Sequence, residues 1–162
     1  MLKDKVALVT GASSGIGYAT SIALSRAGAR VAVGARRKDR LKDLEKVITE
    51  VKGAGVLVHE LDVTDRSNCN SFVDTVVEKW GGIDILVNNA GLMPLSFFKN
   101  NKVDEWDRMI DVNIKGVIYC TSAVIPHMLK KESGHIVNMS SVAGRTVFAG
   151  GTIYCATKHA IT

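Results

Sequence analysis

Short apolar segments rich in β-branched residues alternate with amphipathic segments along the whole chain, and this alternation restricts the fold more than any other feature. Apolar segments of this kind are typical of buried strands, whereas apolar residues at helical spacing indicate helices with one buried face. The predicted strands are 5–10, 30–35, 56–61, 83–88 and 135–140. The predicted helices are 15–27, 39–52, 64–80 with Thr64 as N-cap, 103–131, and one that begins near Thr152. We therefore expect an α/β fold, a doubly wound parallel sheet with helices on both faces.

The composition of the chain limits what it is expected to bind and where it is expected to be located. The 162 residues, 46% of them hydrophobic and 23% charged, suit one globular domain, 1–162, although the chain stops inside its last predicted helix. The net charge of +5 is mild and no basic arm accompanies it, so no nucleic-acid partner is expected. The sequence has neither a run of about 18 apolar residues nor a secretory signal. With three widely spaced cysteines, these features predict a cytoplasmic protein without a membrane span, a disulfide framework or a metal site.

A glycine-rich turn, TGASSGIG at residues 10–17, lies between the first predicted strand and the first predicted helix. In Rossmann-like sheets, glycines at this place allow a tight turn, close approach of the backbone to a pyrophosphate, and close packing of helix on strand. The helix N-terminus offers free N–H groups to the phosphates. This context favours nucleotide binding over the alternative of an ordinary structural turn. The expected cofactor-binding residues are Gly11, Ser13, Ser14, Gly15, Ile16 and Gly17.

The same turn resembles the T-G-x(3)-G-x-G cofactor motif of the short-chain dehydrogenase/reductase (SDR) family, which has one extra residue between the first two glycines. The resemblance implies a single NAD(P)-binding Rossmann domain that is incomplete here, because family members typically run to about 250 residues. The C-terminal strands and the segment that closes over substrate would be absent. A homodimer or homotetramer is implied for the full-length protein.

The corner after the second predicted strand reads Ala35-Arg36-Arg37-Lys38 and holds no carboxylate before Asp39. In NAD-binding folds an acidic residue at this corner bonds the adenosine ribose 2′-hydroxyl, and Ala35 occupies the position of that acid in the resembled family. Arg36, together with Arg37, can instead pair with a 2′-phosphate. We therefore expect NADP(H) in preference to NAD(H). The alternative is that these basic residues form only the solvated start of a helix.

Three further segments resemble SDR motifs. Asp62 and Val63 match the site whose acidic side chain and next backbone amide contact adenine, with a helix N-cap as the alternative role for Asp62. The segment Asn88-Asn89-Ala90-Gly91 matches the N-N-A-G signature, which implies a structural role in the sheet and a cofactor contact by Asn89. Asn113 matches the helix asparagine that holds a water near the catalytic lysine; otherwise it is a polar residue at a kink near Gly116. The resemblance adds Asp62, Val63, Asn89, Ala90 and Gly91 to the expected cofactor site.

Tyr154 and Lys158 form a Y-x(3)-K pair, which places both side chains on one face of the last predicted helix. Alone, such a pair would be a chance surface arrangement in most sequences. Here Ser140 and Ser141 end a predicted strand, at the sheet edge where doubly wound folds bind ligands. The family's catalytic serine most often precedes its tyrosine by thirteen positions, which selects Ser141. The expected catalytic residues are Asn113, Ser141, Tyr154 and Lys158.

Hydride transfer to a carbonyl carbon leaves an alkoxide that must be protonated, and a phenol with a pKa of about 10 is poorly matched to neutral pH. A nearby ammonium favours the phenolate, so Lys158 would tune Tyr154 as acid and base. Lys158 would also hold the nicotinamide ribose hydroxyls, so Tyr154 and Lys158 belong to the expected cofactor site as well. Tyr154 and Ser141 would contact the substrate oxygen. We therefore expect an NADP(H)-dependent alcohol dehydrogenase or carbonyl reductase, with a non-catalytic NADP(H)-binding module or scaffold as the alternative. A nucleotide-sugar epimerase is disfavoured, because such relatives usually have a shorter glycine loop.

Overall fold

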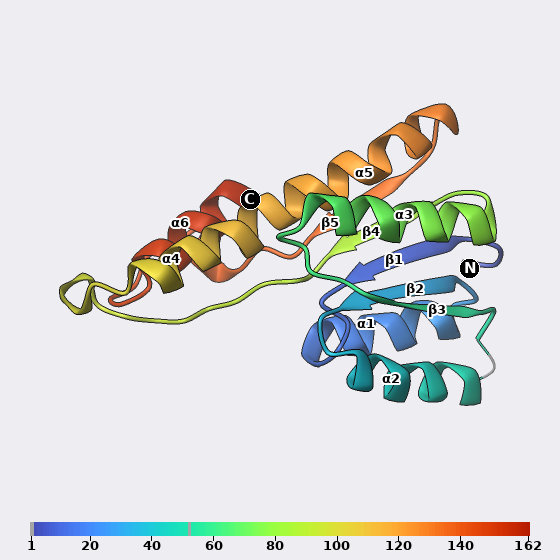
Figure 1. Ribbon diagram of the computed structural model, residues 1–162, viewed down its shortest axis with the longest axis horizontal. Helices are drawn as coiled ribbons and strands as arrows, with labels where there is room; N and C mark the ends of the chain where they lie inside the picture. Colours follow the sequence, from blue (N-terminus) through green and yellow to red (C-terminus); the bar gives the residue numbers. More distant parts are fainter. Residues whose placement is uncertain (1, 52) are drawn as a thin grey trace.

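A five-stranded sheet with the strand order β3-β2-β1-β4-β5 forms the centre of the molecule (Figure 1). The computed structural model describes residues 2–51 and 53–162. All neighbouring strands are parallel, and Val9 is paired with Val33 on one side and Val87 on the other. The prediction of a Rossmann-like parallel sheet is confirmed. The strands are β1 (Val6–Thr10), β2 (Arg30–Ala35), β3 (Val56–Glu60), β4 (Ile85–Asn88) and β5 (His135–Asn138).

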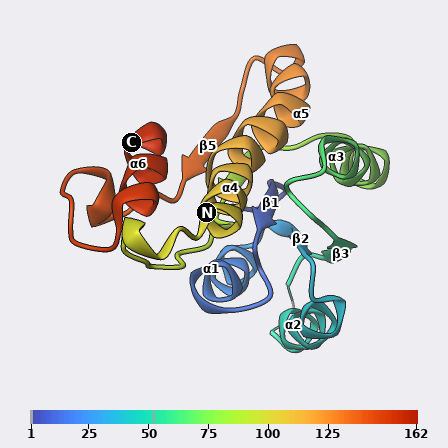
Figure 2. The same cartoon turned by 60° about the vertical axis from the view of Figure 1, so that its left-hand side comes forward.

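Helices cover both faces of the sheet. In Figure 1, α1 and α2 lie on one face, and α3 and α5 lie on the other. The remaining helices, α4 and α6, lie side by side beyond the carboxyl ends of the strands in both views (Figures 1 and 2). None of the helices within residues 2–51 and 53–162 is both long enough and apolar enough to span a lipid bilayer. The helices are α1 (Gly15–Arg26), α2 (Lys38–Glu50), α3 (Arg66–Trp80), α4 (Val103–Ile110), α5 (Gly116–Lys130) and α6 (Thr152–Ile161).

The apolar strands are buried because successive side chains point to opposite faces that are both covered. Val6 and Leu8 of β1 join the core under α3 and α5, where Phe72 is the largest fully buried side chain. Ala7 and Val9 join the opposite core, which includes Leu41 and other apolar residues of α2. This two-sided burial explains why the strands read as continuous apolar runs rather than as alternating patterns.

Several predicted boundaries differ from the structure. The N-cap of α3 is Asp65, not Thr64, because the Asp65 carboxylate accepts from the backbone N–H groups of Ser67 and Asn68 at 2.8 and 3.2 Å. The Thr64 hydroxyl instead donates to the Asp62 carboxylate at 2.8 Å. Strand β5 ends two residues earlier than predicted. Lys52, predicted as the end of the second helix, lies outside the described residues.

The long helix predicted over 103–131 is divided by a π-helical turn, Asp111–Lys115, between α4 and α5. A wider turn in the backbone ladder therefore precedes Gly116, where a kink is the alternative interpretation for Asn113. Asn113 lies in this turn and is buried, where its side chain bonds two other segments of the chain. The turn thus places a polar side chain at the carboxyl end of the sheet.

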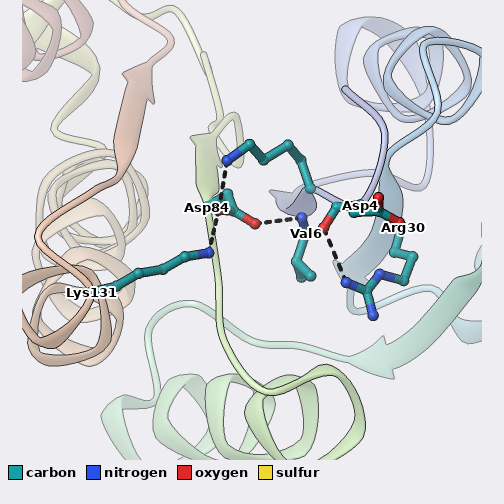
Figure 3. Close-up of polar contacts among 6 residues, drawn as sticks. Asp4, Val6, Arg30, Asp84 and Lys131 are labelled. Atoms are coloured by element: carbon teal, nitrogen blue, oxygen red, sulfur yellow. Dashed lines mark hydrogen bonds and ion pairs between the residues drawn. The ribbon is translucent and has the colours of Figure 1, made fainter. Parts of the chain in front are cut away.

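A charged clamp holds the opposite end of the sheet, where Asp84 precedes β4 (Figure 3). The buried carboxylate of Asp84 accepts from the Val6 backbone N–H at 2.8 Å and from the Lys5 ammonium at 3.4 Å. It also accepts from Lys131, which follows α5. The clamp therefore joins the starts of β1 and β4 to the end of α5.

Candidate active site

The glycine-rich turn connects β1 to α1 with the conformations that its composition predicts. Gly11 and Gly15 have φ values of +65° and +58°, in the left-handed region that favours glycine. A Cβ on Gly17 would lie 2.6 Å from the carbonyl oxygen of Gly11, so only glycine lets α1 pack this closely on the turn. A Cβ on Gly15 would meet no protein atom within 4 Å, which leaves open space beside that backbone.

Thr10 and Asn89 tie the glycine turn to the segment after β4. The Thr10 hydroxyl accepts from the backbone N–H groups of Asn89 and Ala90 at 3.1 and 3.0 Å. The Asn89 carboxamide donates to the carbonyl oxygens of Thr10 and Gly11 at 3.0 and 3.2 Å. No role is predicted for Thr10 from the sequence, where its one signal is its place immediately before the glycines. The Asn89 side chain positions the turn itself.

A cavity of about 470 Å³ opens at the carboxyl ends of β1 to β4. It brings together ten of the predicted cofactor residues, and adds Ala35, Leu61, Leu92 and Val112 to its walls. Five predicted cofactor residues are not among its lining residues: Gly15, Ile16 and Gly17 at the start of α1, and Tyr154 and Lys158 on α6. The ten are Gly11, Ser13, Ser14, Arg36, Arg37, Asp62, Val63, Asn89, Ala90 and Gly91.

Arg37 reaches across the cavity wall to the glycine turn. Its guanidinium donates to the Ser13 and Ser14 hydroxyls at 3.0 and 2.8 Å. Arg36 lines the same cavity and is exposed, and Ala35 is buried at the end of β2. Both arginines therefore stand where the sequence predicts a 2′-phosphate, but Arg37 makes the contacts to the turn.

Tyr154 and Lys158 lie together on α6, with the Lys158 ammonium 5.9 Å from the centre of the Tyr154 ring. The ammonium is buried and donates to the Met139 carbonyl oxygen, just after β5, at 2.7 Å. Burial lowers the pKa of Lys158 below its ordinary value, because desolvation disfavours the charged form. A charge held in such surroundings interacts strongly with any group that develops negative charge nearby.

Asn113 and Gly91 connect this pair to the cavity. A Cβ on Gly91, which lines the cavity, would lie 3.3 Å from Asn113 Oδ1 and 3.7 Å from Lys158 Nζ. The Asn113 amide donates to the Thr157 hydroxyl at 3.1 Å, and that hydroxyl donates to the Tyr154 carbonyl oxygen at 2.8 Å. No role is predicted for Thr157 from the sequence. The structure therefore gathers Asn113, Tyr154 and Lys158 at the Gly91 end of the cavity.

Ser140 and Ser141 have different surroundings. Ser140 is directed to α6, where its hydroxyl donates to the Lys158 carbonyl oxygen at 3.1 Å and bonds the Thr162 hydroxyl. Ser140 therefore packs the end of this segment against α6. The Ser141 hydroxyl accepts from the Ala143 backbone N–H at 3.1 Å, and Ser141 lies two residues after Met139, which binds Lys158. Its proton is free to be donated elsewhere, because an accepting hydroxyl keeps its donor.

Two loops beyond the strand ends expose large apolar side chains. Met93, Phe97 and Phe98 are 53%, 56% and 54% exposed, so they do not pack in the core. Leu92 does pack against the core under α3 and α5. The second loop, 142–150, is joined to the first by a hydrogen bond from the Ser96 N–H to the Gly150 carbonyl oxygen at 3.0 Å.

Comparison with known proteins agrees with this arrangement. The short chain dehydrogenase family model matches residues 5–162. An uncharacterized oxidoreductase of Staphylococcus saprophyticus is 52% identical over 160 residues, which make up 99% of this chain and 64% of that protein. The chain therefore spans less than two thirds of the length of that relative.

Solved structures are similar over nearly the whole chain. A metagenomic short-chain oxidoreductase in complex with NADP has a TM-score of 0.92 and 37% identity, covering 97% of this chain and 71% of that one. An alcohol dehydrogenase from Thermococcus sibiricus, complexed with 5-hydroxy-NADP, has a TM-score of 0.91 and 34% identity, covering 97% and 66%. Sequence and fold point to one lineage, and this chain belongs to the short-chain dehydrogenase/reductase family of oxidoreductases.

Proposed function

We propose that this chain is the NADP(H)-binding and catalytic part of an oxidoreductase that acts on CH–OH donors with NADP as acceptor. Hydride would pass between the nicotinamide and a hydroxyl or carbonyl carbon of a small molecule. The observation that carries the proposal is the Tyr154–Lys158 pair, which lies with Asn113 near Gly91, one of the residues that line the cavity. A cytoplasmic location and a homodimer or homotetramer of the full-length protein are part of the proposal.

The residues around the cavity fit a dinucleotide with a 2′-phosphate. The open space beside Gly15 and the start of α1 suit a pyrophosphate, because the first N–H groups of a helix attract anions. Asp62 and Val63 would hold the adenine, and Arg36 and Arg37 the 2′-phosphate. Ala35 supports NADP(H), since an acidic side chain there would repel a phosphate. The NADP complexes of two similar proteins favour the same cofactor.

NADPH, when bound, would supply the hydride, and the side chains would bind the substrate oxygen and transfer its proton. In the reducing direction, the Ser141 hydroxyl would donate to the carbonyl oxygen while negative charge develops there. The Tyr154 phenol would then protonate that oxygen, and the desolvated Lys158 ammonium would stabilise the resulting phenolate. In oxidation the same phenolate would accept the alcohol proton. Lys158 would also hold the nicotinamide ribose hydroxyls, and Asn113 would hold a water beside it.

The exposed loop side chains favour a substrate with an apolar body next to its carbonyl or hydroxyl group. Met93 and Phe97 come from the loop after β4, and Val142 and Phe148 from the loop after β5. Burying such side chains against an apolar substrate removes their surface from water, which contributes about 25 cal/mol per Å². We therefore expect longer-chain or aromatic carbonyl compounds to be turned over with lower KM than short polar ones.

The test is NADPH oxidation by the full-length protein against a panel of carbonyl compounds, followed with Tyr154→Phe. We expect the wild type to turn over at least one compound, and the variant to bind NADPH with unchanged affinity but show no turnover. Tyr119→Phe, on α5 and not among the residues that line the cavity, is the matched control and should keep full activity. Turnover by Tyr154→Phe would reject the mechanism. NADPH binding without any turnover by the wild type would favour the alternative of a non-catalytic binding module.

A further inference from the structure

Two buried cysteines outside the candidate active site touch each other. Cys69 lies in the first turn of α3 and Cys120 in α5, 51 positions later, and their sulfur atoms are 3.6 Å apart. Both side chains belong to the core between the sheet and these two helices, where they are 1% and 2% exposed. The third cysteine, Cys155, is buried on α6.

The contact is fixed by close packing of α5. A Cβ on Gly116 would lie 2.7 Å from Val63 Cγ2, so the first turn of α5 approaches the segment before α3 more closely than another residue would allow. Cys120 follows Gly116 by four residues and so lies one turn along the same face. The Cys69 thiol meets the carbonyl oxygen of the same Val63 at 3.6 Å. Both thiols are therefore held at one junction between α3 and α5.

The two thiols have different acidities. The hydrogen bond from Cys120 lowers the pKa of Cys69, and it does so against burial and the charges of Asp65 and Asp62. The same hydrogen bond and burial raise the pKa of Cys120. Since the thiolate is the nucleophile in thiol oxidation, Cys69 is the thiol that attacks and Cys120 the one that follows.

We propose that Cys69 and Cys120 form a peroxide-sensitive oxidation site that closes into an intramolecular disulfide. In the first step the Cys69 sulfur attacks hydrogen peroxide, the O–O bond breaks, and Cys69 sulfenic acid and one water form. In the second step the Cys120 sulfur displaces the sulfenic hydroxyl, which leaves as a second water with the Cys120 proton. Peroxide gains two electrons, and each thiol loses one hydrogen atom. The sulfurs need to approach from 3.6 Å to about 2.05 Å.

Such a bond would tie α3 to α5 beside the cavity. Val63 and Val112 line the cavity, and Val63 contacts the Gly116 turn from which Cys120 follows. Because both sulfurs are buried, the reaction needs local opening, and we expect it to be slower than oxidation of an exposed thiol.

The experiment treats the reduced, folded protein with hydrogen peroxide and maps its peptides by mass spectrometry without reduction. We expect two of the three cysteines to be lost as free thiols, a Cys69–Cys120 linked peptide, and full recovery with dithiothreitol. Cys155→Ser is the matched control and should form the same link. Cys69→Ser and Cys120→Ser should form none, and the corresponding alanine variants, which suit the apolar core, repeat the test if a serine variant fails to fold.

The proposal is overturned if all three thiols persist under peroxide that fully oxidises dithiothreitol in the same buffer. It is equally overturned if the link joins two molecules, involves Cys155, or forms only after the protein is unfolded. These readouts do not depend on enzymatic activity, so they are separate from the test of Tyr154.

Discussion

Asn113 binds the backbone of Leu92 through both ends of its carboxamide: Oδ1 accepts from the Leu92 N–H, and Nδ2 donates to the Leu92 carbonyl oxygen, each at 2.9 Å. The π-helical turn between α4 and α5 thereby holds the loop that follows β4 beside Lys158. Both ends of the Asn113 carboxamide therefore bond protein groups, in addition to the water that Asn113 is expected to hold near Lys158.

Asn113→Ala should therefore destabilise the fold as well as impair turnover. Two backbone groups of Leu92 would lose their partners, and a loss of roughly 2–3 kcal/mol in the free energy of unfolding is expected. Urea unfolding measures it. Asn70→Ala, on the exposed face of α3, is the control and should change stability by less than about 0.5 kcal/mol. Equal losses in the two variants would show that the Leu92 contacts contribute nothing.

The sequence was sufficient to predict the sheet and its helical layers, because strands covered on both faces must be apolar throughout. It predicted Thr64 as the cap of α3 where the structure has Asp65, and because both residue types cap helices, residue type alone does not separate them. The choice depends on Asp62, which engages the Thr64 hydroxyl. The sequence also did not predict the π-helical turn, because the residues of this turn have ordinary helical spacing.

The candidate site, like the fold, could be predicted only in part from the sequence. Spacing alone placed Tyr154 and Lys158 on one face of a helix, and sequence position placed the glycines. Spacing could not show that Lys158 reaches Met139, nor that Arg37 rather than Arg36 binds Ser13 and Ser14. These contacts join side chains to segments that are distant in sequence, so they depend on the tertiary arrangement of the strand ends. The catalytic and cofactor roles themselves stay predictions.

Arg37 should contribute to the preference for NADPH over NADH. Arg37→Ala removes a guanidinium beside the expected 2′-phosphate, and a charge-assisted hydrogen bond of about 1.5 kcal/mol or more corresponds to at least a roughly tenfold rise in KM for NADPH. The KM for NADH should stay unchanged, since NADH carries no such phosphate. Arg40→Ala, exposed on α2, is the control. A wild type that works faster with NADH, or an equal effect on both cofactors, would contradict this assignment.

Replacing Gly17 should mainly affect the stability of the fold, whereas replacing Gly15 should mainly affect NADPH binding. Gly17→Ala puts a methyl group against Gly11 and should lower the free energy of unfolding by about 1–3 kcal/mol, as overpacked sites do. Gly15→Ala meets open space, so its main effect should be weaker NADPH binding, with a smaller loss of stability from its positive φ. Thermal unfolding and NADPH titration separate the two. Gly82→Ala, also in open space but without a positive φ, is the control and should change neither.

The Asp84 clamp should make stability depend on acidic pH. Burial by itself would raise the pKa of Asp84, but the hydrogen bonds from Lys131 and Val6 and the charges of Lys131 and Lys5 outweigh it, and the net pKa lies below the ordinary value. Between the folded and the unfolded pKa of Asp84, the native state therefore binds fewer protons than the unfolded state. The stabilisation is present in full above the unfolded pKa of about 3.9 and is lost as pH falls through the folded pKa.

Asp84→Asn should lower the free energy of unfolding at neutral pH by roughly 1–3 kcal/mol, because hydrogen bonds to a charged group are lost. Below about pH 5, the free energy of unfolding of Asp84→Asn should also depend less on pH than that of the wild type. Urea midpoints measured from neutral to acidic pH test both points. Asp43→Asn removes an exposed pair with Lys46 and serves as control, with a change of at most about 0.5 kcal/mol. If the wild type and Asp84→Asn lose the same amount of stability on acidification, titration of Asp84 does not cause the loss.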